Sequence, residues 1–276
     1  MFKSYSNWMK QNPIPTFFLL TFLIAWSIWL PVGYLAPQAF LLVIIPGAWA
    51  PTVASFYLTW LTDGKDGLRK FLRRVVHWKV GLRWYLVCLF GIAAIAFAAQ
   101  GLNFWLFGGE PISLNLPAGV PENGLLIALP IIFLVNIFFG GPLAEDIGWR
   151  GYALPKLREK MDAFSASLVI GAIWVLWHLP FFWISEGNSA VGSIPFLWFG
   201  LMTMAWSVLF AWVYVNTESI FMPILFHAAV NTTLGTLGVL GQSKGDLTPV
   251  ILNTLLTWVV VGVLRFTAGK ELKRYG

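Results

Sequence analysis

Residues 11–62 have the sequence QNPIPTFFLLTFLIAWSIWLPVGYLAPQAFLLVIIPGAWAPTVASFYLTWLT, in which no aspartate, glutamate, lysine or arginine occurs. About 20 apolar residues are enough for one helix to cross a bilayer, so this segment is long enough for two crossings. Pro31, Gly33 and Pro37 are turn formers and mark the expected break between the two helices. The segment predicts a helical membrane protein, because a spanning helix satisfies its own backbone hydrogen bonds in lipid.

Six further stretches lack acidic and basic residues for long enough to cross a membrane. The predicted protein is therefore all-α, a polytopic bundle of about eight transmembrane helices in a single domain that covers residues 1–276. Its composition agrees, since 58% of the residues are hydrophobic and 11% are charged, whereas a soluble domain has about 25% charged residues. Cys88 is the single cysteine, so no internal disulfide can form. The six stretches are 84–109, 123–144, 163–185, 187–217, 219–243 and 247–264.

The distribution of basic residues predicts the orientation. With eight helices both termini lie on one side, and every lysine and arginine except Lys244 then falls on that side. Loops on the opposite side carry Glu110, Glu122 and Glu186. Because lysine and arginine concentrate in cytoplasmic loops, we expect cytoplasmic N- and C-termini, in the plasma membrane if the source is prokaryotic. The net charge of +6 is then a collar facing anionic lipid, and no nucleic-acid partner is expected.

An amphipathic segment is predicted over residues 66–80, within the most basic loop. Leu68, Phe71, Leu72 and Val75 recur there at helical spacing, with arginines and a lysine between them. Such a pattern is typical of a short helix that lies on the inner leaflet, and a charged surface loop is the alternative.

Imidazole and amide side chains lie inside two of the predicted spans. Polar groups inside a membrane are costly, so they are candidates for function. His178 lies in one span, and His227 lies four residues before Asn231 in another. Residues four apart project from the same helical face, so His227 and Asn231 are expected to act at one place.

An acidic segment ends the predicted span 123–144. Asp146 and Arg150 are four residues apart with the acid first, which favours an ion pair. Glu145 is rotated by about 100° from Asp146 and is left free to face another group. By helix length Glu145 is shallower than the histidines, unless the Gly-Gly-Pro sequence at 140–142 bends its helix inward.

These residue types together can hydrolyse an amide. A carboxylate beside an imidazole, here Glu145 and His178, can hold and deprotonate a water molecule. His227 and Asn231 supply donors for a developing oxyanion. Alternatively, Glu145, His178 and His227 could ligate Zn²⁺ with a water in the fourth position, although no H-E-x-x-H motif is present. A serine nucleophile in a G-x-S-x-G motif is absent.

Three short motifs occur in order on separate predicted helices: EDIGWR at 145–150, WVLWH at 174–178 and HAAVN at 227–231. They resemble the patterns E-E-x-x-x-R, F-x-x-x-H and H-x-x-x-N/D of the CPBP family of intramembrane proteases, the CAAX prenyl endopeptidase and bacteriocin-processing (Abi) group. The resemblance covers residues 142–231, about a third of the chain.

The resemblance implies a role for each matching residue. Glu145 would be the catalytic base, and His178 would help to bind and polarise the water. His227 and Asn231 would stabilise the oxyanion, and Arg150 would orient the acidic segment.

Two positions depart from the family pattern. Asp146 stands where the family has a second glutamate, and Trp174 replaces phenylalanine while keeping an aromatic wall. The resemblance also implies a membrane-associated substrate, either a prenylated C-terminus or a hydrophobic peptide. Both a metal-dependent mechanism and a metal-free glutamate mechanism have been described for such proteases, and the metal-free form is favoured here.

Two other classes of function remain as alternatives. Glu145, His178 and His227 could form a proton relay in a proton-coupled transporter. Transporters often contain inverted repeats, and this sequence has no second copy of the acidic cluster. A catalytically silent scaffold that binds other membrane proteins is the third class.

Overall fold

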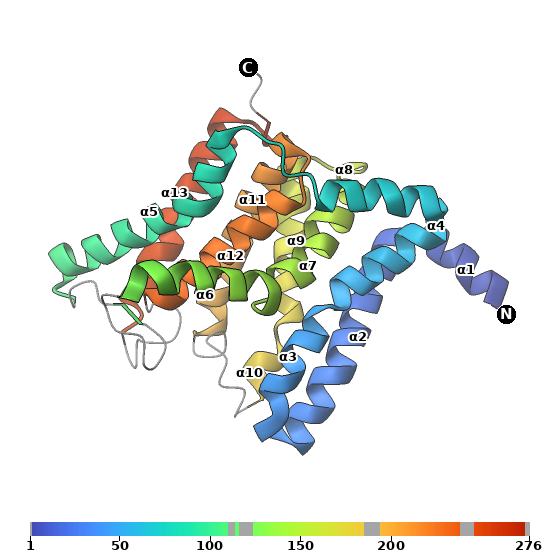
Figure 1. Ribbon diagram of the computed structural model, residues 1–276, viewed down its shortest axis with the longest axis horizontal. Helices are drawn as coiled ribbons and strands as arrows, with labels where there is room; N and C mark the ends of the chain where they lie inside the picture. The colour runs from blue at the N-terminus through green and yellow to red at the C-terminus, as the bar shows by residue number, and fades with distance from the viewer. Residues whose placement is uncertain (1, 110–113, 116–123, 185–193, 238–245, 274–276) are drawn as a thin grey trace.

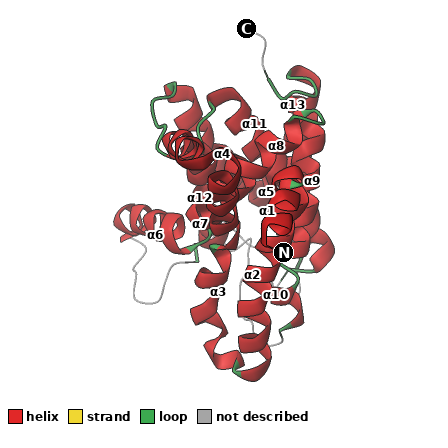
Figure 2. Ribbon diagram, turned by 90° about the vertical axis from the view of Figure 1, so that its right-hand side faces the viewer, coloured by secondary structure: helices red, strands yellow, loops and turns green. Residues whose placement is uncertain are grey.

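The computed structural model of this chain describes residues 2–109, 114–115, 124–184, 194–237 and 246–273. Four residues on which the expected orientation depends lie outside the described residues: Glu110, Glu122, Glu186 and Lys244. Within them every regular element is a helix, as Figure 2 shows.

The helices follow one another with short connections in most places (Figure 1). The 3₁₀ turn is named η1, and η3 is one π-helical stretch. In chain order the elements are α1 (Phe2–Gln11), α2 (Pro13–Leu35), η1 (Pro37–Ala39), α3 (Phe40–Ala48), α4 (Ala50–Val75), α5 (Leu82–Phe107), α6 (Leu125–Phe139), α7 (Pro142–Gly148), η3 (Trp149–Ala153), α8 (Leu154–Arg158), α9 (Ala163–Trp177), α10 (Pro180–Trp183), α11 (Phe196–Thr217), α12 (Phe221–Thr236) and α13 (Thr248–Thr267).

Long apolar helices identify an integral, multi-pass membrane protein. Among the described residues six helical segments are long and apolar enough to cross a membrane, and a seventh is a bent pair. The pair joins α6 to the helix at Pro142–Arg158 at an angle of 47°. The six are Pro13–Leu35, Pro37–Val75, Leu82–Phe107, Ala163–Trp183, Phe196–Thr217 and Thr248–Thr267.

Eight spans were expected, and the expected span that is not among these seven is α12. That helix has 16 residues, and its sequence includes His227, Asn231 and three threonines. It is buried on all sides, from Met222 to Val230, so its neighbours are other helices and it does not need a long lipid-facing surface. A second difference concerns the break inside residues 11–62, because α2 continues through Pro31 and Gly33 and ends before Pro37.

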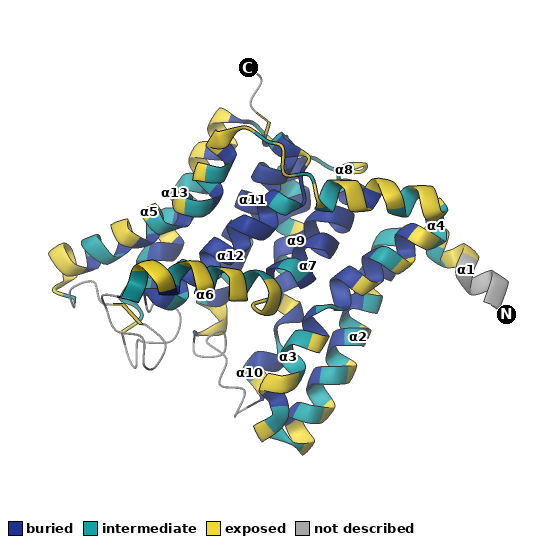
Figure 3. Ribbon diagram, in the orientation of Figure 1, coloured by how far each residue is buried: buried dark blue, intermediate teal, exposed yellow. Residues whose placement is uncertain are grey.

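A central group of helices holds the most buried residues. Helix α11 packs against α9, α12 and α13, and α12 also packs against α5, α6 and α7. Figure 3 shows this centre as the darkest part of the molecule, with α5 and α2 more exposed around it. Glu145 and Asp146 of α7 and His227 of α12 are buried and therefore lie inside the bundle.

The break between α6 and α7 occurs at two glycines. Gly141 has φ +100°, a conformation that side chains with a Cβ rarely adopt. A Cβ on Gly141 would also lie 2.3 Å from Oε1 of Glu145. The glycines therefore provide the bend that the sequence suggested, and they leave room for the Glu145 carboxylate.

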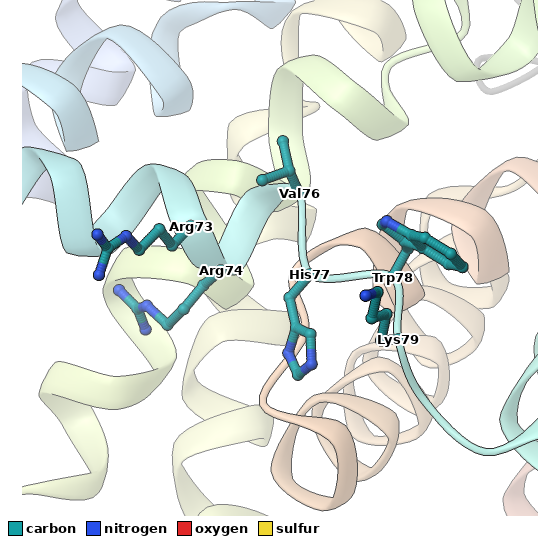
Figure 4. Close-up of a pocket in the computed structure, with 6 residues that line it drawn as sticks. All are labelled: Arg73, Arg74, Val76, His77, Trp78 and Lys79. Atoms are coloured by element: carbon teal, nitrogen blue, oxygen red, sulfur yellow. The ribbon is translucent and has the colours of Figure 1, made fainter.

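The basic segment is a helix that ends earlier than expected. Helix α4 breaks at Gly64, which has φ 65° and ψ −158°, and its second part ends at Val75 rather than near residue 80. Beyond it the chain is non-helical up to Gly81, and Figure 4 shows Arg74 on the end of the helix and His77 within the non-helical stretch. The backbone carbonyl of Arg74 accepts from the backbone N–H of Ile220 at 2.9 Å, which fixes the segment against the start of α12.

Gly148 lets α7 pack closely on α4, and this packing provides a test of the fold. A Cβ on Gly148 would lie 2.5 to 2.6 Å from atoms of Pro51, including its backbone. We expect Gly148→Ala to lower the free energy of unfolding by about 1–3 kcal/mol, as overpacking does, measured by thermal unfolding in detergent.

Gly262→Ala in α13 is the matched control, because a Cβ there meets nothing within 4 Å. It should leave stability unchanged or slightly higher, since alanine favours a helix. Equal unfolding temperatures for the two variants would show that α7 and α4 are not in close contact.

Candidate active site

Helix α7 carries a fully buried acidic segment. Glu145 is 6% exposed, Asp146 0% and Arg150 1%. The helix begins directly after Gly141, with Pro142 at its first position, where a proline fits without losing a hydrogen bond. The backbone carbonyl of Ala144 accepts from the hydroxyl of Thr52 on α4 at 2.6 Å, which fixes the segment in the bundle.

The carboxylate of Asp146 accepts hydrogen bonds from two side chains, Arg150 and His227. Its Oδ1 accepts from Nη1 of Arg150 at 2.7 Å, so the ion pair expected from the spacing is present. Its Oδ2 accepts from Nδ1 of His227 at 2.8 Å. Since a carboxylate accepts, Nδ1 of His227 carries a proton and Nε2 is the nitrogen left for the cavity. Asp146 therefore acts through His227, a contact that the sequence analysis missed.

The carboxylate of Glu145 is held by Trp174, which stands at the phenylalanine position of the family pattern. The indole Nε1–H of Trp174, on α9, donates to Oε2 of Glu145 at 2.7 Å. The guanidinium of Arg150 lies 4.5 Å from the centre of the Trp174 ring and 4.7 Å from that of Phe210, where cation–π attraction operates. A phenylalanine at position 174 would keep the ring contact and lose the hydrogen bond to Glu145.

His178 follows the last residue of α9 and is 9% exposed. Its Nδ1–H donates to the backbone carbonyl of Trp174 at 2.8 Å, because a carbonyl oxygen can only accept. The ring packs among aromatic side chains, including Phe199 of α11 at 5.2 Å between centres. Both histidines are therefore oriented through Nδ1, and Nε2 is their remaining ring nitrogen.

Asn231 connects α12 to the break between α6 and α7. Its side-chain Nδ2 donates to the backbone carbonyl of Gly140 at 2.9 Å. An amide NH₂ group has two donors, so one N–H of Asn231 is available for a second acceptor.

The four side chains predicted to act together line one cavity of about 90 Å³. Three residues of α11 complete its wall, and the sequence did not indicate them, because α11 has no charged residue and its aromatic and hydroxyl residues resemble ordinary packing. A second cavity of about 150 Å³ adjoins it at Glu145 and His178 and has a largely aromatic and aliphatic lining. The first cavity is lined by Gly140, Glu145, Trp174, His178, Phe199, Thr203, Trp206, His227 and Asn231.

The zinc alternative does not fit this geometry. It requires Glu145, His178 and His227 to converge on one ion, and in the described part of the chain no three His, Cys, Asp or Glu side chains are placed to hold a metal.

The fold and the site together define an integral membrane protein with a carboxylate, two imidazoles and a carboxamide in one internal cavity. The sequence profile of the family described as type II CAAX prenyl endopeptidase Rce1-like matches residues 127–233, which contain all four side chains. A relative, CAAX prenyl protease 2 of Methanococcus maripaludis, is 25% identical over 246 residues, or 85% of this chain and 88% of the relative. The matched segment and the relative make this chain similar to the Rce1-like CAAX prenyl endopeptidases, a family of proteases.

The bridge at Asp146 predicts a large stability effect. Asp146→Asn keeps the shape of the side chain but leaves Arg150 as a buried, unpaired cation. We expect a loss of about 3–5 kcal/mol in the free energy of unfolding, the range measured when one partner of a buried ion pair is removed. Thermal or chemical unfolding in detergent measures it.

Glu159→Gln is the matched control, since Glu159 pairs with Lys156 at 3.3 Å on the surface and is 62% exposed. A surface pair is worth about 0–1 kcal/mol, so this variant should unfold close to the wild type. Similar small losses in both variants would mean that Asp146 is not buried between two partners.

Proposed function

We propose that this protein is an intramembrane endopeptidase that cleaves a prenylated peptide or protein near its C-terminus with a water molecule activated by Glu145. The observation that carries the proposal is that Glu145, His178, His227 and Asn231, from three separate helices, line the same cavity. Similarity to this family supports the class of reaction, and the names of the family and of the relative support a prenylated substrate over an unmodified hydrophobic peptide.

Water activation requires a base and a second group that orients the water. Glu145 removes a proton from the water as its oxygen attacks the scissile carbonyl carbon, and His178 orients the water through Nε2. The indole of Trp174 holds one carboxylate oxygen of Glu145 at 2.7 Å, which fixes the direction in which the base points.

The developing negative charge falls on the carbonyl oxygen of the substrate. Asn231 has a second amide N–H that can donate to this oxygen. His227 donates from Nε2 when the ring carries a proton on both nitrogens, with Nδ1–H on Asp146 at 2.8 Å. The carbon–nitrogen bond then breaks, and Glu145 returns its proton to the leaving nitrogen, so the products are a carboxylate and an amine.

The topology belongs to the same proposal. We assign eight spans, with the buried α12 as the eighth, in one membrane domain over residues 1–276 with cytoplasmic termini. The second part of α4, residues 65–75, lies at the inner leaflet, where Lys65, Arg69 and Arg73 meet anionic head groups. A C-terminus that is prenylated on the cytoplasmic side can then reach the site from the lipid. The basic distribution supports this orientation, and the membrane is the plasma membrane if the source is prokaryotic.

Cleavage of a defined peptide tests the proposal. The purified protein in detergent should cleave a farnesylated peptide that ends in a CAAX sequence, with the products identified by mass spectrometry. We expect Glu145→Gln to lower kcat by a factor of about 10² or more, because the amide cannot accept the proton of the water.

The surface variant Glu159→Gln should cleave at the rate of the wild type and serves as the control. Unchanged turnover in Glu145→Gln would remove Glu145 as the base. Transport of a solute by reconstituted protein without any cleavage would favour the transporter class instead.

A further inference from the structure

One face of α11 lies along the candidate active site. Phe199, Thr203, Trp206 and Phe210 are spaced by four, three and four residues, so they share a face of the helix. The ring of Phe199 lies 5.2 Å from that of His178, and the ring of Phe210 lies 5.3 Å from that of His227. Thr203 and Trp206 therefore occupy the part of the helix between the two histidines.

These two middle residues have buried polar atoms with no protein partner. Thr203 is 1% exposed and Trp206 is 5% exposed, and both line the cavity that contains Glu145. Neither Oγ1 of Thr203 nor Nε1 of Trp206 has a hydrogen-bond partner within the described residues. Buried polar groups in folded proteins are nearly always paired, so such an exception calls for an explanation.

Other hydroxyl groups in these helices show what pairing is normally available. Thr217 on the same helix donates to the carbonyl four residues before it at 2.8 Å, and Thr254 and Thr257 on α13 do the same at 2.7 and 2.6 Å. Ser207, also on α11, donates to the carbonyl of Ser167 at 2.8 Å. The hydroxyl of Thr203, a residue that lines the cavity, makes no such bond within the described residues.

The chemistry of the two groups restricts what they can bind. An indole N–H is a donor only, so its partner must be an acceptor, and the threonine hydroxyl can donate to the same kind of atom. The cavity of about 90 Å³ holds roughly three water molecules at about 30 Å³ each, or a short piece of peptide backbone. Carbonyl oxygens are the acceptors that every peptide substrate carries.

We propose that Trp206 and Thr203 are peptide-binding residues, whose N–H and O–H groups donate to a backbone carbonyl oxygen of the substrate next to the scissile bond. This assignment rests on the proposed endopeptidase function. In this assignment α11 binds the peptide, and α12 carries the donors for the oxyanion.

The two donors can be removed with little change in shape, by Trp206→Phe and by Thr203→Val. A hydrogen bond to a carbonyl outside the reacting bond is made equally in the ground state and the transition state, so its loss raises KM and leaves kcat unchanged. We expect KM for the farnesylated CAAX peptide to rise about tenfold in each variant, with kcat within about twofold of the wild type. The unfolding temperature should not fall, because neither variant breaks a bond within the protein.

Trp212→Phe is the matched control on the same helix. Its Nε1 is also buried without a partner within the described residues, but its ring packs on Trp84 at 5.0 Å, away from the cavity. KM should be unchanged in this variant. A rise equal to that of Trp206→Phe would show that a buried indole N–H matters for the helix and not for the peptide.

Binding measured without turnover separates this inference from the proposed function. In a Glu145→Gln background, the Kd for the fluorescently labelled farnesylated peptide should rise about tenfold on adding Trp206→Phe, and similarly on adding Thr203→Val. Binding and KM unchanged in both variants would overturn the assignment while cleavage by the wild type leaves the endopeptidase standing. A lower kcat at constant KM would also overturn it, in favour of oxyanion donors. If Trp206→Phe does not fold, Thr203→Val decides.

Binding that is weakened as expected, in a protein that cleaves nothing, would support the peptide site and remove the proposed reaction.

Discussion

The buried carboxylate of Asp146 joins α7 to α12, two of the helices that form the candidate active site. It accepts from Arg150, on the adjoining η3, at 2.7 Å and from His227, on α12, at 2.8 Å. Charges inside a bundle are tolerated when they are paired and hydrogen-bonded, and removal of one partner leaves the others uncompensated. Arg150 also lies against the ring of Trp174, whose indole N–H holds Glu145. The orientation of the base and that of one histidine therefore depend on the same ion pair.

The break between α6 and α7 places Glu145 at the level of the histidines. Gly141 adopts a positive φ and leaves space beside the Glu145 carboxylate, and Asn231 donates to the carbonyl of Gly140. A continuous helix would use the carbonyl of Gly140 within its own backbone ladder, so the break provides an acceptor for Asn231. The hydrogen bond from Asn231 therefore joins the break to α12, and the candidate active site lies at this junction.

The sequence was sufficient for the helical class, the pairing of Asp146 with Arg150 and the group of four side chains that line one cavity. Those features follow from local spacing and from the cost of polar groups in lipid. It did not indicate that α12 is a short helix buried on all sides, because an apolar run has the same composition in either place. The contact of Asp146 with His227 and the cavity wall from Thr203 and Trp206 were also missed. They depend on how helices distant in the sequence pack, and nothing in the local pattern distinguishes these residues from packing side chains.

The proposed hydrolysis requires Glu145 and His178 to act on one water molecule. An experimental structure of the wild-type protein in lipid, at a resolution that shows ordered water, measures this directly. We expect a water within hydrogen-bonding distance of both the Glu145 carboxylate and Nε2 of His178. A cavity in which Nε2 of His178 points away from Glu145, so that no water can contact both, would contradict it.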